Sequence, residues 1–221
     1  MLIRKCMIYH NNQMQNAHAP CPVEKDSSIN PRNFMPTYSQ KPIAQQKGAL
    51  PTNRTISTIP KADDDASAQE NKLWEYPSPQ QFFNAVMKKG FTNTQEEDVP
   101  AMVSIHNAVN ERAWQEILEW ERSSGAEKCG GVKLVQFRGD SKILTPKARM
   151  LSFFGYTRPF DTHFWTIDRC GTKVDYVIDF YKGKQAESSD PRKLLMPSFY
   201  LDVRPHGIEG FPARLRRVVG F

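Results

Sequence analysis

Residues 100–122 read PAMVSIHNAVNERAWQEILEWER, and their apolar side chains recur with the period of an α-helix. Around that helix the apolar residues share one broad face: Met102, Val103, Ile105, Val109, Ala113, Trp114, Ile117, Leu118 and Trp120. The opposite arc is polar, with Arg112, Gln115, Glu116 and Glu119. The sequence therefore predicts a long helix that buries its apolar face against the rest of the domain.

His106 is the polar exception on this predicted face. One interpretation is a core histidine whose ring nitrogens are satisfied by neighbouring groups. The other is a ligand to a metal or to haem iron, which requires a neutral imidazole in a rigid, apolar setting. Periodicity alone does not choose between these two interpretations.

The net charge of the chain resides in its N-terminal part. Residues 1–61 hold eight Lys or Arg against Glu24 and Asp26, which accounts for the whole net charge of +6, and residues 62–221 hold 22 charges of each sign. Without a net basic field in the remainder, nucleic-acid binding is not expected. No apolar run approaches the roughly 20 residues that span a bilayer, and no secretory signal is recognisable, so any membrane contact is expected to be peripheral.

Residues 1–71 are rich in Pro, Asn, Gln, Ser and Thr and are predicted to be mostly disordered. Two short segments within them stand out. In Cys21-Pro22 the proline favours an extended cysteine, whose thiolate would be available to a soft metal such as haem iron. Residues 50–61, LPTNRTISTIPK, are expected to form a strand or clamp that packs on the core.

The four cysteines, Cys6, Cys21, Cys129 and Cys170, form no C-x-x-C pair. Zinc sites usually contain closely spaced ligands, and c-type cytochromes carry C-x-x-C-H, so neither class is expected. A disulfide between Cys129 and Cys170 depends on their distance, which the sequence leaves open.

A folded core is predicted over residues 72–205, followed by a basic tail or short helix at 206–221. Ser78, Pro79 and Gln81 predict a capped helix that ends at Gly90. Later signals predict a strand at 133–137, a helix after Thr145-Pro146, a hairpin of 163–169 with 174–181, and a further strand at 198–203. This pattern is typical of an α+β fold, with helices packed on a small antiparallel sheet and a long, largely disordered N-terminal tail.

Two groups of residues in the core are candidates for function. Trp74 and Tyr76 precede the first helix and are either core anchors or aromatic residues that stack on a flat ligand. Asp161, His163 and Arg169 are predicted to form one polar cluster at the entrance of the hairpin. In one interpretation Asp161 caps a turn, His163 is a side chain at the start of a strand and Arg169 pairs with a surface carboxylate. In the other interpretation the group provides a general acid or base together with an anion clamp.

Four long motifs follow one another along the chain: WEYPSPQQFFNAVMKKG, IHNAVNERAWQEILEWE, RPFDTHFWTIDRCG and VDYVIDFY. In order and spacing, over about residues 50–205, they resemble the mitochondrial cytochrome c-type haem lyases, also called holocytochrome c synthases. The resemblance implies haem as substrate and bound ligand, and apocytochrome c or c1 as partner. The reaction it implies joins the C-x-x-C-H thiols to the haem vinyl groups as thioethers. It also implies the mitochondrial intermembrane space, with peripheral binding to the inner membrane.

Carried over by position, the resemblance makes His106 an axial ligand of haem iron, opposite the histidine of the substrate. Two axial imidazoles would fix the haem relative to the substrate thiols and make the addition intramolecular. Glu111 is expected to orient or contact the substrate, and Trp74 and Tyr76 match an aromatic motif associated with the haem pocket. Cys21 with its proline matches a Cys-Pro motif often found in the family.

Asp161, His163 and Arg169 fall in a second motif of the family, for which haem-propionate binding or pocket support is expected. Arg169 is the preferred propionate partner on charge grounds. The chain departs from other members at Thr162 and Phe164, where more polar residues stand beside the histidine. Two alternatives are a non-catalytic haem-binding regulator or chaperone, in which Cys21 senses haem, and a structural module with a buried core histidine.

Overall fold

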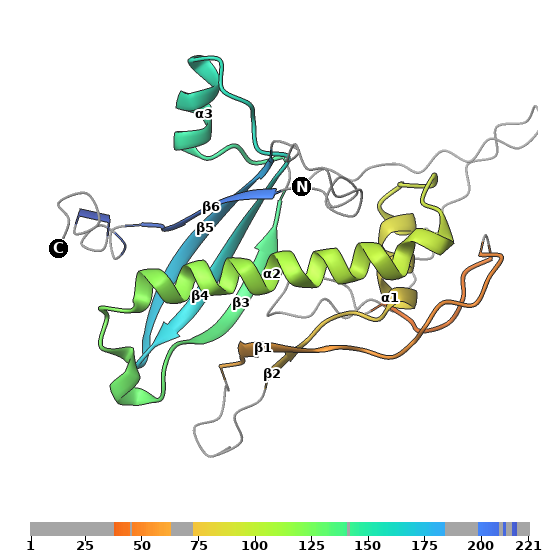
Figure 1. Cartoon of the computed structure of the whole chain (residues 1–221), viewed down its shortest axis with the longest axis horizontal. Coiled ribbons are helices and arrows are strands. Elements are labelled where there is room, and N and C mark those ends of the chain that lie inside the picture. Colours follow the sequence, from red (N-terminus) through yellow and green to blue (C-terminus); the bar gives the residue numbers. More distant parts are fainter. Residues whose placement is uncertain are drawn as a thin grey trace, which may run out of the picture.

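The computed structural model of the chain describes residues 38–44, 46–62, 73–140, 142–183, 199–207, 210 and 214–215. These residues form the predicted α+β fold, with three α-helices and two antiparallel sheets (Figure 1). The predictions for residues 1–37, including Cys21, and for most of the basic C-terminal segment lie outside the described residues.

The larger sheet has four antiparallel strands in the order β3-β4-β5-β6. Their bounds are Lys133–Gly139 for β3, Asp161–Arg169 for β4, Thr172–Lys182 for β5 and Phe199–Pro205 for β6. The predicted hairpin is confirmed, since Arg169 pairs with Thr172 across a turn at Cys170 and Gly171. Both turn residues have positive φ, 50° and 82°, a conformation that matches the twist of antiparallel strands.

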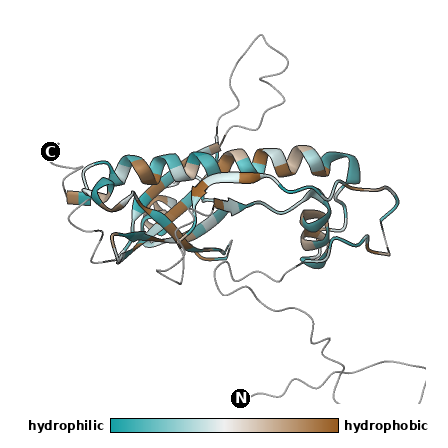
Figure 2. Cartoon of the chain, turned by 90° about the horizontal axis from the view of Figure 1, so that it is seen from below, coloured by the Kyte–Doolittle hydropathy of each residue, from teal (hydrophilic) through white to brown (hydrophobic). Residues whose placement is uncertain are grey.

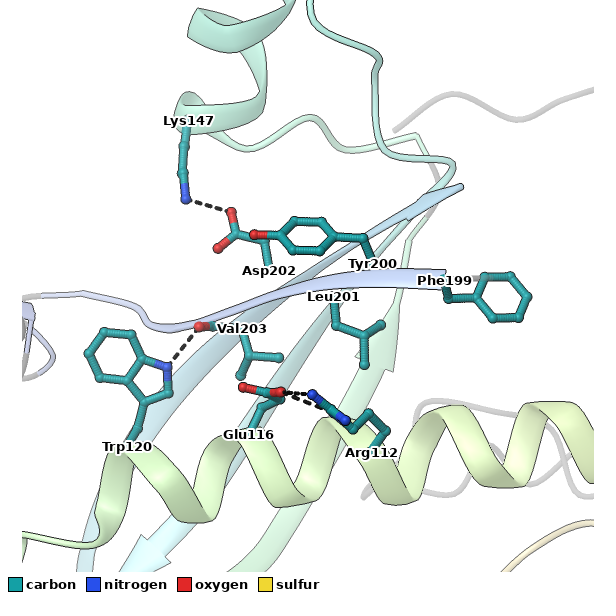
Figure 3. A pocket seen from close by; sticks show the side chains of 9 residues that line it. All are labelled: Arg112, Glu116, Trp120, Lys147, Phe199, Tyr200, Leu201, Asp202 and Val203. Carbon is teal, nitrogen blue, oxygen red and sulfur yellow. Dashed lines mark hydrogen bonds and ion pairs between the residues drawn. The ribbon is translucent and has the colours of Figure 1, made fainter. Parts of the chain in front are cut away.

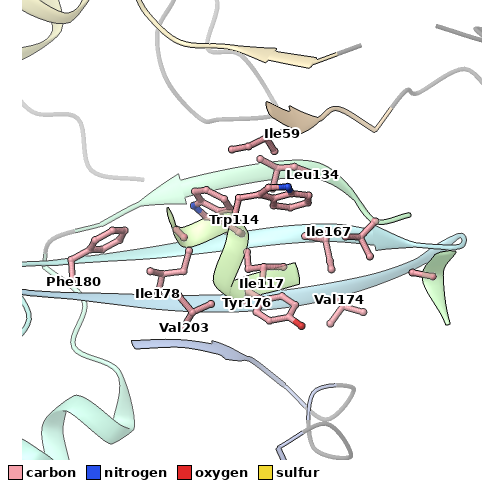
Figure 4. Packing of buried hydrophobic residues seen from close by; sticks show 14 residues of the cluster. Ile59, Trp114, Ile117, Leu134, Ile167, Val174, Tyr176, Ile178, Phe180 and Val203 are labelled. Atoms are coloured by element: carbon pink, nitrogen blue, oxygen red, sulfur yellow. The ribbon is translucent and has the colours of Figure 1, made fainter. Parts of the chain in front are cut away.

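The long helix α2, Val99–Glu121, lies against this sheet and continues past it to α1, Pro79–Lys88 (Figure 1). The C-terminal half of α2 packs Trp114 and Ile117 into the main core (Figure 4). Its N-terminal part packs Val99 and Val103 into a second cluster around Phe83 of α1. One helix therefore serves two hydrophobic clusters, and His106 lies between the residues that belong to each.

The main core is built from the face of the sheet that α2 covers. Alternate residues of β5, Val174, Tyr176, Ile178 and Phe180, share this face and are all buried. Other strands add Ile59, Leu134, Ile167 and Val203 (Figure 4). Colouring by hydropathy shows α2 along one side of the molecule with hydrophilic and hydrophobic residues alternating along it (Figure 2).

The buried face of α2 differs from the predicted one. Its buried residues are Val99, Val103, Asn110, Ala113, Trp114, Ile117 and Glu121, whereas Met102 and His106 are exposed. The prediction that His106 lies on a buried face was wrong. The face is rotated because two polar side chains on it have internal partners: the Asn110 amide donates to the carbonyl of His106 (3.0 Å), and Glu121 accepts hydrogen bonds from the sheet.

The opposite face of the sheet also buries polar groups. Asp179, fully buried, accepts hydrogen bonds from the hydroxyls of Thr145 (2.7 Å) and Thr162 (2.9 Å) and from the guanidinium of Arg204 (2.7 Å). Thr145 is also the N-cap of α3, Pro146–Phe153, and accepts from the backbone N–H of Ala148. This network fixes the first turn of α3 to the sheet.

A second, two-stranded sheet joins β1, Ile56–Pro60, to β2, Leu73–Glu75, antiparallel. Ile59 of β1 is buried in the main core. The start of α1 has the predicted capping box between Ser78 and Gln81. Two short 3₁₀ helices, η1 at Glu96–Asp98 and η2 at Ala126–Cys129, flank α2, and a disulfide joins Cys129 to Cys170 with a Cα–Cα distance of 5.6 Å.

Candidate functional site

His106 projects from α2 beside α1 and is accessible to solvent. Its ring lies 5.8 Å from the ring of Phe82, and neither ring nitrogen has a hydrogen-bond partner among the residues that the structure describes. Although solvent reaches the side chain, desolvation by the surrounding protein lowers its pKa to about 4. Nearby His163 and Lys89 lower this pKa further, and Asp161 opposes them. His106 is therefore neutral at pH 7, with a ring nitrogen available to a metal.

His163 and Asp161, on β4, form a hydrogen-bonded pair close enough to His106 to influence its charge. The Nε2 of His163 lies 3.0 Å from the Asp161 Oδ2, and its ring packs edge-on against Phe180 at 4.6 Å. Desolvation opposes the charge on Asp161, but the hydrogen bond and charge of His163 outweigh it and lower the pKa of this carboxyl. An Asp–His pair is a suitable proton donor or acceptor.

The Nδ1 of His163 is buried and has no hydrogen-bond partner among the described residues. Gly139, opposite His163 on β3, makes room for the imidazole, because a Cβ there would lie 2.8 Å from the Nε2. Buried ring nitrogens normally have partners. The ring is thus held in place by Asp161, Phe180 and the space above Gly139, with one nitrogen unsatisfied.

Glu111 lies on α2 and holds two other segments of the chain. Its carboxylate accepts hydrogen bonds from the Tyr76 hydroxyl (2.9 Å) and from the backbone N–H (3.0 Å) and hydroxyl of Thr58 on β1. Desolvation and Glu111 together raise the pKa of Tyr76, so its hydroxyl remains a donor. In this structure Glu111 is a positioning residue that fixes β1 and Tyr76 against α2.

We expect Glu111→Ala to lower the free energy of unfolding by about 1–3 kcal/mol, because the buried Tyr76 hydroxyl and the Thr58 donors lose their acceptor. Chemical denaturation measures the change, and amide exchange at Thr58 should accelerate. Glu119→Ala is the matched control, since within the described part of the chain Glu119 makes one ion pair, an exposed one with Arg122. Equal stability of the two variants would contradict the positioning role.

Trp74 packs on the edge of the main sheet. Its Nε1 donates to the Leu134 carbonyl (3.2 Å), its ring meets Phe137 edge-on at 5.4 Å, and Lys61 lies over the ring at 5.3 Å. These contacts are those of a core anchor, one of the two interpretations that the sequence left open.

The prediction that Arg169 clusters with Asp161 and His163 was wrong. Asp161 and Arg169 are the first and last residues of β4, and at roughly 3.3 Å per residue they lie about 26 Å apart. Arg169 instead makes a bidentate ion pair with Glu121 (2.5 and 2.6 Å), which also accepts a hydrogen bond from the Tyr176 hydroxyl. Its guanidinium is occupied within the protein.

A groove of about 580 Å³ lies between α2, β6 and the start of α3 (Figure 3). Two ion pairs line it, Arg112 with Glu116 and Lys147 with Asp202, each at 2.7 Å. The Trp120 indole closes one end by donating to the Val203 carbonyl (2.8 Å). Among the described residues, none of those predicted for haem binding lines this groove.

Some residues around His106 were absent from the sequence-based prediction. Phe82 and Lys89 lie on and just after α1, and only the tertiary fold brings them to α2. Glu121 was identifiable, because it follows Trp114 by seven residues and therefore shares its helix face. Among the described residues, no group of three or more His, Cys, Asp or Glu is arranged to hold a metal ion.

Comparison with known proteins places these residues in a family. The family model described as "Cytochrome c/c1 heme lyase" matches residues 2–219. The chain belongs to the cytochrome c/c1 heme lyase family. It is accordingly a haem lyase, a holocytochrome c-type synthase that attaches haem to apocytochrome c or c1.

Its relatives cover most of the chain. A Schizosaccharomyces pombe protein is 53% identical over 156 residues, 71% of this chain and 68% of its own length. The "Holocytochrome c-type synthase" of Homo sapiens is 40% identical, covering 85% of this haem lyase and 69% of its own length. The "Holocytochrome-c synthase" of Saccharomyces cerevisiae is 37% identical, with shares of 90% and 80%. No solved structure was found to match the chain.

Proposed function

We propose that His106 is the axial ligand through which this haem lyase holds haem iron while the thioethers form. The observation that carries the proposal is a neutral, solvent-accessible imidazole with no hydrogen-bond partner among the described residues, whose pKa is lowered to about 4. The histidine of the substrate C-x-x-C-H motif would take the opposite axial position. Haem is the substrate, and the two ligands fix its ring relative to the cysteine thiols.

The bond-forming step is an addition without net oxidation or reduction. Each cysteine S–H bond breaks, the sulfur bonds to one vinyl carbon and the hydrogen goes to the other. The Asp161–His163 pair, close to His106, is positioned to move this proton or to contact the haem periphery. In this proposal Glu111 acts indirectly, by holding Tyr76 and β1 beside the same helix.

The proposed location is the mitochondrial intermembrane space, with peripheral association with the inner membrane. Family membership supports the mitochondrial location. None of the described helices is long and apolar enough to span a bilayer. The proposed partners of this chain are apocytochrome c, apocytochrome c1 or both, together with haem.

Co-expression with apocytochrome c, and separately with apocytochrome c1, tests the function. Haem staining of the denatured products detects covalent attachment, and a substrate whose C-x-x-C-H cysteines are serines is the control. Stain on either native substrate and none on the control supports the proposal and names the partner. Absence of covalent haem on both, with haem still bound to the chain, would instead support the non-catalytic haem-binding alternative.

The lowered pKa of His106 predicts how haem binding responds to acid. In the window from the ordinary pKa of 6.5 down to about 4, the unfolded chain binds a proton at His106 that the folded chain does not. Titration of His106 therefore leaves the free energy of unfolding unchanged above pH 6.5 and lowers it as the pH falls toward 4. Iron competes with the proton for the same imidazole, so ligation should persist well below pH 6.5.

A pH titration of the Soret band of the purified haem complex measures this prediction, with circular dichroism at each pH to detect unfolding. We expect the His106-dependent band to be lost only at about pH 4 or below, because iron competes with the proton for the imidazole. Loss of the band with a midpoint near 6.5, in protein that is still folded, would show that the imidazole is not desolvated in the complex.

A further inference from the structure

The helix α3 and the turn after it expose large apolar side chains. Fractional exposure is 56% for Met150, 85% for Phe153, 69% for Phe154 and 66% for Tyr156. Of the helix itself only Ala148 is buried, and Figure 1 shows α3 projecting from the end of the sheet. Soluble monomers seldom expose neighbouring large apolar side chains unless these serve as a contact surface.

These four residues form one surface, which we name the α3 tip. Met150 precedes Phe153 and Phe154 by three and four residues, so the three are neighbours on a helix. The rings of Phe153 and Phe154 lie 5.5 Å apart, edge to face. After Gly155, with φ of 85°, the N–H of Tyr156 donates to the Leu151 carbonyl (3.1 Å) and keeps Tyr156 at the end of the helix.

The segment of sequence that carries the α3 tip, between Asp140 and Asp161, contains basic residues as its only charged residues. Residues 142–160 contain Lys142, Lys147, Arg149 and Arg158 and no Asp or Glu. Lys147 pairs with Asp202 at the base of the helix. The other three have no ion-pair partner among the described residues. Exposed aromatic side chains flanked by basic residues match the interfacial region of a membrane that contains anionic lipid.

The base of α3 is fixed while its tip is exposed. Thr145 is held by the buried Asp179 through a hydrogen bond of 2.7 Å and caps the helix through Ala148. The tip is therefore presented on a rigid support.

We propose that the α3 tip is the surface through which the chain binds an anionic lipid membrane. Phe153, Phe154 and Tyr156 enter the headgroup region, and Arg149 and Arg158 face the lipid phosphates. This inference goes beyond the proposed peripheral association by naming the surface that makes it. It does not depend on the role of His106.

Co-sedimentation of the full chain with vesicles of phosphatidylcholine and phosphatidylserine tests the proposal. We expect the double variant Phe153→Ser, Phe154→Ser to bind the vesicles at least about tenfold more weakly, because it lacks two aromatic side chains that transfer from water into the membrane interface. Phe91→Ser is the matched control, since Phe91 is 64% exposed in the loop after α1. Arg149→Gln should weaken binding and reduce its salt dependence, whereas Lys173→Gln, an exposed lysine at the hairpin turn, should not.

Equal binding by wild type and the double variant, or equal loss in Phe91→Ser, would overturn the proposal. The single variant Phe153→Ser, at the most exposed of these positions, serves if the double variant does not fold. Haem attachment to apocytochrome c without lipid separates the two proposals. If the double variant still attaches haem but no longer binds vesicles, the lipid surface is supported. If it loses attachment and binds vesicles as before, the α3 tip is a protein-docking surface instead. Vesicle binding through the tip by a chain that attaches no haem would leave this inference standing and remove the proposed function.

Discussion

His106→Ala is expected to lower covalent haem attachment to apocytochrome at least about 100-fold while leaving the fold intact. The loss is large because an axial ligand makes the addition of thiol to vinyl group intramolecular, and such positioning accounts for several powers of ten in rate. The fold should survive, since the side chain is exposed and makes no hydrogen bond with the described part of the chain. Haem staining of co-expressed substrate measures the activity, and denaturant unfolding measures the stability.

His206→Ala is the matched control for this experiment. His206 is also exposed and touches an aromatic ring, that of Phe164 at 6.1 Å, but it lies after β6 and away from α1. We expect it to attach haem at the wild-type level. A His106→Ala variant that attaches haem as well as His206→Ala would remove His106 from the mechanism, and one that unfolds would return it to a structural role.

Arg169→Ala is expected to destabilise the protein by about 3–5 kcal/mol, the largest effect on stability that we predict. Glu121 is nearly fully buried, so removal of its bidentate partner leaves an uncompensated carboxylate inside the protein. Desolvation and Glu121 raise the pKa of Tyr176, so its hydroxyl still donates one hydrogen bond to the carboxylate but carries no charge that could compensate it. Denaturant unfolding measures the loss, with Arg122→Ala as control because the Arg122–Glu119 pair is exposed and contributes about 0–1 kcal/mol.

Two further measurements distinguish the two roles considered for Arg169. If the arginine is structural, the double variant Glu121→Gln, Arg169→Gln should recover part of the stability, because no unpaired charge remains, and the double-mutant cycle should show strong coupling. If Arg169 binds a haem propionate, its loss should weaken haem binding in protein that remains stable. That second pattern would contradict our assignment of Arg169 to the Glu121 network.

The local elements of the fold were predictable because short-range signals specify them. Ser78 and Gln81 identify the start of α1, the apolar period identifies α2, and the alternation on either side of Cys170-Gly171 identifies the hairpin. The rotation of the buried face of α2 was harder to predict from the sequence. It depends on Asn110 and Glu121, two polar residues whose burial is compensated by partners that hydropathy does not reveal.

The sequence named candidate residues, whose roles stay predictions, but it did not predict how they are arranged. The sequence predicted a strand only from 163 to 169, whereas β4 runs from Asp161 to Arg169 and its rise per residue separates these two by about 26 Å. By contrast, the approach of Phe82 and Lys89 to His106 depends on how α1 packs on α2, and the space that Gly139 leaves for His163 depends on strand register. Neither relation has a short-range signature in the sequence.

The most direct test of our account is the absorption spectrum of the chain purified with haem, recorded for wild type and for His106→Gly with and without added imidazole. We predict a Soret band typical of histidine ligation in the wild type, its loss in His106→Gly, and its return when imidazole occupies the vacated position. An unchanged spectrum in His106→Gly would show that another residue ligates the iron and would contradict the account.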